Sequence, residues 1–85
     1  MKYFIICGLI NDLEDEEVKV DNAIFTDKKN ASEQLVKLKN EIVNSLKESF
    51  ENETVNCVIT EDSLEIYLDN GYYCNFNIYE ITDLK

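Results

Sequence analysis

The sequence contains no histidine, arginine, proline or tryptophan, and it has only two glycines, Gly8 and Gly71. Without histidine, a serine or cysteine nucleophile lacks the base that most often activates it. Two widely separated glycines cannot form the glycine-rich loop that holds a phosphate group. These absences favour a non-enzymatic protein, and we expect no catalytic residues and no cofactor.

Cysteine is also scarce, with Cys7, Cys57 and Cys74 far apart in the chain. An odd number argues against a disulfide framework, and no Cys-x-x-Cys pair indicates a zinc or redox site. Each cysteine lies in an apolar or strand-like segment, where a free thiol behaves as a small hydrophobic group. We therefore expect three buried, reduced cysteines in a cytoplasmic protein.

Long hydrophobic runs are absent as well, since no segment approaches the roughly 20 apolar residues needed to cross a membrane. Residues 1–10, MKYFIICGLI, superficially resemble a signal peptide, but they lack a small-residue cleavage site and lead directly into acidic residues. We interpret them as a buried strand. With 85 residues and 45% hydrophobic content, the chain is long enough for one small folded domain, residues 1–85.

Positive charge comes only from lysine, and the net charge is −10. Nucleic acid and anionic membranes require a positive surface, so neither is expected as a direct partner. The charges are also sorted along the chain. Residues 12–17 hold five acidic residues and residues 48–84 hold nine, both without lysine, whereas all eight lysines lie elsewhere with four acidic residues. A basic protein is therefore the expected partner.

Apolar residues recur every three or four positions in residues 30–51, which predicts one long helix with a single core-facing side. Asn30 followed by Glu33 resembles a capping box, and Thr26 or Asp27 is an alternative cap that would lengthen the helix. The predicted core stripe consists of Ala31, Leu35, Leu38, Ile42, Leu46 and Phe50, widened by Val36 and Val43.

Strand-like alternation follows the helix in residues 54–60, 63–69 and 72–81. Because a slip of one residue would turn every side chain to the other face, the apolar pattern also fixes the register. A two-residue Asn70-Gly71 turn would mix the two faces, whereas a three-residue loop sets Ile66 opposite Cys74. We therefore predict a type I turn with Gly71 in a left-handed conformation.

Before the helix, residues 3–10 are apolar on both faces, as in a central strand, and residues 18–25 suggest another short strand. The predicted fold class is α+β, in two layers with the order β-(β)-α-β-β-β. One long helix, at about residues 30–51, packs on a mainly antiparallel sheet that ends in a three-stranded meander.

The same register predicts the side of the sheet that faces away from the helix. Tyr67 and Tyr73 lie opposite each other there, with Tyr79 and Glu65 on the same side and Asp69 in the adjoining turn. Tyrosine is enriched at protein interfaces because it combines a large apolar ring with a polar tip. Two interpretations remain open: the tyrosines contact a partner or a second copy of the chain, or a loop or residues 11–22 cover them.

The segment NDLEDEE, residues 11–17, holds the densest negative charge. If it is extended, Asp12, Glu14 and Glu16 point the same way about 6.6 Å apart, an interval broadly comparable with the phosphate spacing of a nucleic-acid strand. A solvated acidic loop is the alternative. A calcium loop does not fit, because Glu17 and Ala23 stand where glycine and a bidentate glutamate belong, so no metal site is expected.

We expect partner contacts at the residues that combine the acidic segment with the tyrosine face. These are Asp12, Glu14, Asp15, Glu16, Glu17, Glu65, Tyr67, Asp69, Tyr73 and Tyr79.

In its size, acidity and lack of catalytic residues, the chain resembles small phage-encoded counter-defence proteins, including some anti-CRISPR proteins. Its composition, rich in Asn, Lys, Ile and Glu, is compatible with an AT-rich bacterial or phage genome. The resemblance covers composition and no motif, so no residue roles are carried over. It implies an inhibitor that mimics nucleic acid and occupies the nucleic-acid-binding surface of a host nuclease complex, such as a CRISPR nuclease.

Two alternatives remain. The first is a small homo-oligomeric module, in its simplest form a homodimer, that buries its tyrosine face. The second is an immunity or antitoxin protein that neutralises a basic toxin.

Overall fold

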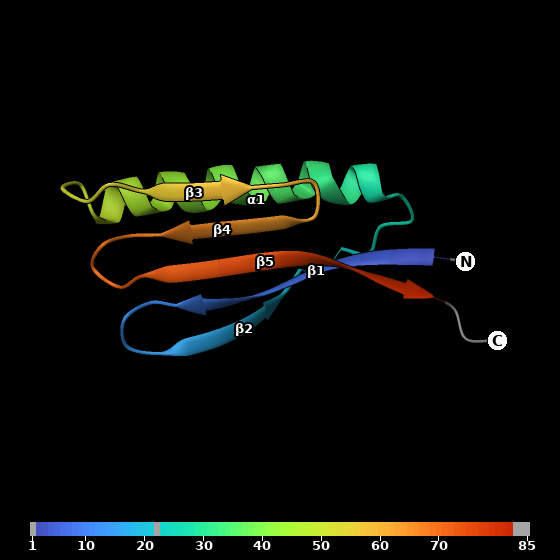
Figure 1. Cartoon of the computed structure of the whole chain (residues 1–85), viewed down its shortest axis with the longest axis horizontal. Helices are drawn as coiled ribbons and strands as arrows, with labels where there is room; N and C mark the ends of the chain where they lie inside the picture. The colour runs from blue at the N-terminus through green and yellow to red at the C-terminus, as the bar shows by residue number, and fades with distance from the viewer. Residues whose placement is uncertain (1, 22, 83–85) are drawn as a thin grey trace.

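The computed structural model describes residues 2–21 and 23–82. The sheet and helix consist of β1 (Lys2–Asn11), β2 (Glu16–Val20), α1 (Lys28–Ser49), β3 (Asn56–Ile59), β4 (Ser63–Tyr67) and β5 (Tyr73–Thr82). The strands form one sheet in the order β2-β1-β5-β4-β3, and all neighbours are antiparallel. The helix packs on one face of the sheet (Figure 1). The predicted α+β fold is confirmed.

The core lies between α1 and the three middle strands. Its largest fully buried side chains are Ile6, Leu35, Leu64, Ile66 and Cys74, so β1, α1, β4 and β5 all contribute. The two ten-residue strands β1 and β5 pair along their whole length, from Lys2 opposite Thr82 to Asn11 opposite Tyr73. Residues 3–10 therefore form an interior strand, as expected, although β5 takes the middle position.

The predicted register of the last hairpin is confirmed. Ile66 lies opposite Cys74 and Leu64 opposite Phe76. The N–H of Gly71 donates to the carbonyl oxygen of Leu68 at 3.2 Å, and Gly71 has a φ of 105°, in the left-handed region that favours glycine.

The helix is shifted by two residues at each end from the predicted range 30–51, and its start follows from the alternative cap at Asp27. Asp27, not Asn30, is the N-cap, and its carboxylate accepts a hydrogen bond from the N–H of Lys29 at 2.7 Å. The helix therefore starts at Lys28 and ends at Ser49, where Phe50 leaves the helical conformation while its N–H still donates to Leu46 at 2.8 Å. The aspartate offers a short acceptor that satisfies a free N–H of the first turn, so the capping box at Asn30 is not needed.

Two expectations about burial are wrong. Val36 is 44% exposed and lies outside the core stripe. Among the cysteines only Cys74 is buried, whereas Cys57 on the edge strand β3 is exposed and Cys7 is half-buried. Cys57 lies on the edge strand β3, outside the strands β1, β4 and β5 that α1 contacts, and Cys7 lies on the face of β1 that points away from the helix.

In the described part of the chain, no helix has the length and hydrophobicity needed to span a membrane.

Gly8 is required by the close approach of β1 and β5. A Cβ atom at this position would overlap the carbonyl oxygen of Asn75 and lie 2.6 Å from Cδ1 of Phe76. We expect Gly8→Ala to lower the free energy of unfolding by about 3 kcal/mol, because the backbone of β5 would have to move. Urea denaturation measures this loss. The neighbouring Cys7→Ala should cost about 1 kcal/mol or less, and equal effects of the two substitutions would contradict the argument.

The buried pair of Tyr72 and Cys74 should make stability fall at alkaline pH. Burial is the main cause that raises the pKa of Tyr72 to about 12 and that of the Cys74 thiol to about 11. Because the unfolded chain loses these protons first, stability should be constant below about pH 9 and fall between about pH 9 and 12, on the order of 1 kcal/mol per group. Denaturation curves across this range measure it. The double variant Tyr72→Phe, Cys74→Ala should show a flatter dependence, and an unchanged slope would contradict the assignment.

Candidate partner-binding surface

Charge is divided between the two layers of the fold. The helix α1 carries five lysines and three glutamates, a net charge of +2. The other described residues, in the sheet and its connections, carry 14 acidic residues and two lysines, a net charge of −12. Asp83, one of the acidic residues expected near the C-terminus, lies outside the described residues. The sorting along the sequence therefore becomes a separation in space, with a mildly basic helix on a strongly acidic sheet.

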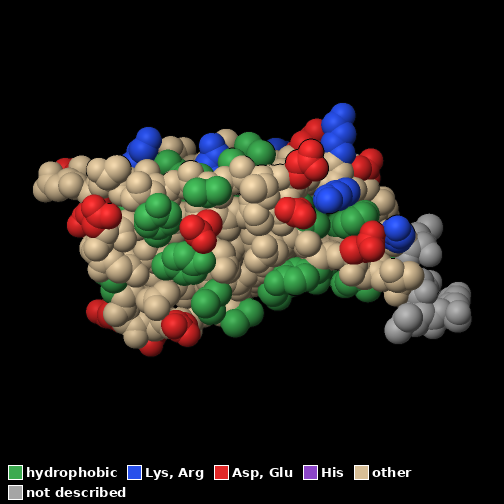
Figure 2. Space-filling view, viewed as in Figure 1, with side chains coloured by type: hydrophobic (Ala, Val, Ile, Leu, Met, Phe, Trp, Pro, Cys, Tyr) green, Lys and Arg blue, Asp and Glu red, His purple; other side chains and the backbone are tan. Residues whose placement is uncertain are grey.

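Three connections meet at one end of the molecule: the β1–β2 turn, the β4–β5 turn and the α1–β3 loop (Figure 1). We call this the acidic end, because residues 12–15, 50–55 and 68–72 contain six acidic residues and no lysine. These are Asp12, Glu14, Asp15, Glu51, Glu53 and Asp69. Figure 2 shows acidic side chains at both ends: at the lower left they stand without lysines, whereas at the right they are mixed with lysines, which also follow the upper edge where α1 lies.

The β1–β2 turn does not have the extended conformation that phosphate-like spacing requires. Residues 12–15 reverse the chain: the N–H of Asp12 donates to the carbonyl oxygen of Asp15 at 3.2 Å, and Leu13 has a left-handed φ of 86°. The straight row of Asp12, Glu14 and Glu16 that an extended segment would give is therefore not formed, and residues 12–15 are an exposed acidic loop, the alternative interpretation. The physical reason is that the apolar residues of β1 pair with β2, so the four residues between the strands have to form the turn.

Asp12 holds this turn together. One oxygen of its carboxylate accepts hydrogen bonds from the N–H of Asp15 at 3.0 Å and from the N–H of Glu14 at 3.3 Å. These two bonds lower the pKa of Asp12 below its ordinary value because they favour the charged form, and the bond from Asp15 has the larger effect. One of the five clustered acidic residues thus has a structural task as well as a charge.

Leu13 brings two acidic turns into contact. An added Cβ at Gly71 in the β4–β5 turn would lie 3.1 Å from Cδ2 of Leu13, so the two turns already touch. Asp69 belongs to the same β4–β5 turn and therefore lies on the same end of the molecule as Asp12, Glu14 and Asp15. Nothing in the sequence pattern indicates this contact between the two turns.

Glu16 and Glu17 point to opposite faces of the sheet, because neighbouring residues of a strand alternate. Glu16 lies on the face away from the helix, where it accepts a hydrogen bond from the Asn11 side chain at 3.4 Å. Glu17 lies on the helix side and forms an ion pair with Lys19 at 3.6 Å. The five acidic residues of the segment therefore do not form a single binding surface.

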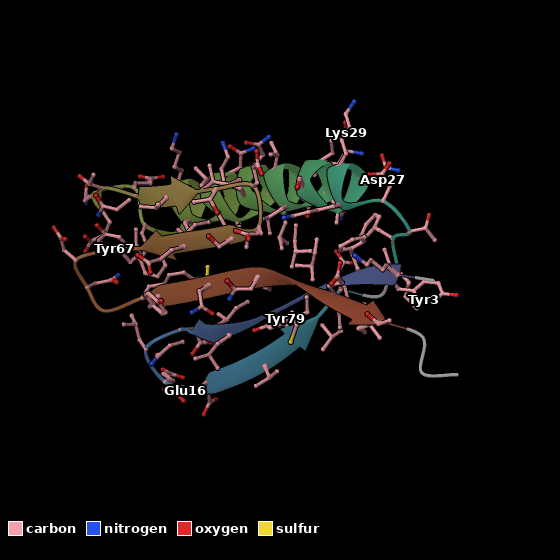
Figure 3. All side chains as sticks on the ribbon, turned by 45° about the vertical axis from the view of Figure 1, so that its right-hand side comes forward. Tyr3, Glu16, Asp27, Lys29, Tyr67 and Tyr79 are labelled. Atoms are coloured by element: carbon pink, nitrogen blue, oxygen red, sulfur yellow. The ribbon has the colours of Figure 1, made fainter. Side chains whose placement is uncertain are left out.

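Tyr67 and Tyr73 lie opposite each other on the face away from the helix, as predicted. The Tyr73 hydroxyl donates to a carboxylate oxygen of Glu65 at 3.1 Å and accepts from the Asn75 side chain at 3.2 Å. Tyr67 is 39% exposed. Figure 3 shows Tyr67 and Glu16 at the end of the molecule opposite the start of α1, marked by Asp27 and Lys29. This pair of tyrosines therefore borders the acidic end.

Tyr79 belongs to a different part of the same face. It is six residues from Tyr73 along β5, which corresponds to about 20 Å in a strand, and it pairs with Ile5. The same face carries the apolar residues Tyr3, Ile5, Leu9, Val18, Val20 and Ile81, and Tyr3, Ile5 and Ile81 line a hollow together with Ile24. Tyr79 itself is 50% exposed. Residues 3–10 are apolar on both faces, and this pattern predicted a central strand. It did not predict that one of the two faces is left without a covering layer.

The alternative that residues 11–22 cover the tyrosines is wrong for the residues that the structure describes in that segment. β2 pairs edge to edge with β1 and extends the sheet, and it does not lie over its face. All five residues of β2 are exposed. The face away from the helix is therefore left open to contact.

The described residues include three free cysteines, of which Cys57 is exposed and Cys74 is buried. They contain no group of three or more Cys, Asp or Glu side chains arranged to hold a metal ion. The thiolate is the reactive form of cysteine, and burial raises the pKa of Cys74 to about 11, which suppresses that form. What the arrangement can provide is charge, hydrogen bonds and exposed aromatic rings, which are the means of a binding surface.

Comparison with known proteins gives no further guide to this surface: no protein-family model, no curated protein and no solved structure matches the chain.

Proposed function

We propose that the protein is a non-enzymatic inhibitor that binds a basic surface of another protein through its acidic sheet layer and acidic end. The observation that supports this is the separation of charge, with −12 on the sheet and its connections and +2 on the helix. A molecule with this distribution turns its sheet side toward a basic partner as it approaches, which raises the association rate.

The proposed target is a nucleic-acid-binding protein, such as a nuclease complex of a bacterial defence system. Such a protein has a strongly basic groove that normally binds phosphates. The acidic end occupies this groove by charge and shape, and not by copying the phosphate interval, because the β1–β2 turn is folded back on itself. A basic toxin is another target that the same surface fits, in which case the protein acts as an antitoxin.

Neutralising the acidic end should weaken the inhibition. The test variant carries Asp12→Asn, Glu14→Gln, Asp15→Asn and Asp69→Asn, and the asparagine that replaces Asp12 keeps an oxygen that can accept the hydrogen bonds of the turn. The control carries Glu33→Lys and Glu41→Lys, which give the same change in net charge at exposed positions of α1, outside the acidic sheet layer and the acidic end. For half-maximal release of nucleic acid from the target, we expect the test variant to need at least about tenfold higher concentration than the wild type. The concentration needed by the control should differ from that of the wild type by about twofold or less.

The measurement has two steps. In the first step, the immobilised protein captures partners from a bacterial lysate that contains a CRISPR nuclease complex. In the second step, the captured partner is purified separately and loaded with labelled nucleic acid. Fluorescence anisotropy follows the release of that nucleic acid as each form is added, at about 50 and 300 mM KCl. Release should weaken at the higher salt, because exposed charges are screened. Equal potency of the test variant and the wild type, or binding that salt does not change, would overturn the proposal.

Self-association through the tyrosine face is a second candidate. It is favoured by the exposure of Tyr67 and Tyr79, which are 39% and 50% exposed on an open sheet face. Aromatic side chains of this kind bury a large area in a contact at a small cost in conformational entropy.

Tyr73→Glu tests this second candidate. The new carboxylate would stand beside Glu65, which now accepts the Tyr73 hydroxyl, so a dimer that buries this face should dissociate at least about tenfold more readily. Sedimentation equilibrium up to about 1 mM protein measures the change. Tyr73→Phe is the control, since it keeps the ring and removes only the hydroxyl. A wild-type monomer over the whole range would exclude this candidate.

A further inference from the structure

The strand β2 forms one edge of the sheet and is exposed along its whole length. Its central residue, Val18, is 70% exposed, more than any other large hydrophobic residue in the described part of the chain. Exposed sheet edges pair readily with other strands unless something prevents it. In the sequence of β2, Glu-Glu-Val-Lys-Val, the side chains of Glu17 and Lys19 lie two positions apart on the helix side, with opposite charges.

The hydrogen bonds of the β1–β2 pair show which groups of β2 point outward. The N–H of Asp21 donates to Ile6 at 2.9 Å and that of Asp12 to Asp15 at 3.2 Å, so odd-numbered residues of this hairpin segment bond to β1. In an antiparallel ladder this role alternates. The N–H and C=O groups of Glu16, Val18 and Val20 therefore point away from the sheet and are available to another strand.

Of the antiparallel registers of β2 with a second β2, the one centred on Val18 alone pairs all five residues of the strand and sets opposite charges against each other. It places Glu17 of each copy opposite Lys19 of the other, in two equivalent pairs. A register centred on Glu17 sets Glu17 against Glu17 of the other copy, and one centred on Lys19 sets Lys19 against Lys19. Like charges directly opposite each other are unfavourable. The register centred on Val18 also sets Val18 against Val18, and Glu16 against Val20, with their free backbone groups facing one another.

From this we infer that a second copy of the chain binds along β2, in an antiparallel, two-fold symmetric contact centred on Val18. The symmetry axis stands perpendicular to the sheet, so the two sheets continue into one and both helices lie on the same side. The two exposed Val18 side chains then meet on the open face. This contact is distinct from the tyrosine face and does not depend on the proposed inhibition.

The contact is short. Beyond the ends of β2, the same register places Asp15 opposite Asp21, and this repulsion limits pairing to the five residues of the strand. An interface of this size buries far less than the roughly 1,200 Å² typical of a stable dimer. The dimer should therefore be weak and reversible, and visible only at high protein concentration.

Charge exchange gives the decisive test, with the mass measured by sedimentation equilibrium from about 10 µM to 1 mM. Lys19→Glu and Glu17→Lys each place like charges opposite each other, and each should raise the dissociation constant at least about tenfold. A mixture of the two variants restores both opposite-charge pairs across the contact but not within either chain. The mixture should dimerise at least as well as the wild type, and so should the doubly exchanged chain.

A second measurement reports the register directly. In concentrated wild-type protein, hydrogen exchange followed by NMR should slow at the amides of Glu16, Val18 and Val20 and stay unchanged at Glu17 and Lys19. Val18→Pro removes the central outward N–H without removing a bond to β1, and it should abolish the dimer. A monomeric wild type at 1 mM, single variants that dimerise like the wild type, or assemblies larger than a dimer would each overturn the inference.

Discussion

The width of a single helix limits this fold. One helix about 10 Å across packs on β1, β5 and β4, whereas the sheet has five strands. The core is therefore restricted to the space between α1 and the strands β1, β5 and β4, where Ile6, Leu35 and Ile66 are fully buried. The two edge strands and the whole opposite face of the sheet remain in contact with solvent, and every candidate binding surface of the molecule lies in this uncovered part.

An uncovered sheet needs protection against unspecific pairing, and charge provides much of it here. The net charge of −12 on the sheet and its connections repels identical copies in most orientations, and charged residues on edge strands are a common means of preventing aggregation. An edge strand that carried only acidic residues would repel a second copy in every register. On β2 the single Lys19 between acidic residues interrupts this repulsion, and the interruption permits one register while leaving the neighbouring ones unfavourable.

The sequence was sufficient for the parts of the fold that depend on periodicity. The alternation of Leu64 and Ile66 against Cys74 and Phe76 has only one register that keeps both strands facing the core, and the structure has that register. It was insufficient where the outcome depends on which surface a partner element reaches. Cys57 has the same alternation as Cys74, yet it is exposed because it lies on the edge strand β3, outside the strands β1, β4 and β5 that α1 contacts. Likewise, the charges of residues 12–17 were evident from the sequence. That residues 12–15 form a turn, and that Glu16 and Glu17 lie in a strand and point to opposite faces, follows from the pairing of β1 with β2.

The β1–β2 turn also explains how a small domain can present charge in a fixed arrangement. A solvated acidic loop would lose conformational entropy on binding, which opposes affinity. Here the Asp12 carboxylate fixes the backbone at Glu14 and Asp15, and Leu13 rests against the β4–β5 turn at Gly71. Part of the entropic cost is therefore met during folding. Repulsion among the clustered carboxylates opposes this order, and the hydrogen bonds to Asp12 offset it while keeping that residue ionised. An acidic end that is ordered before contact favours recognition of a basic surface by shape as well as by charge.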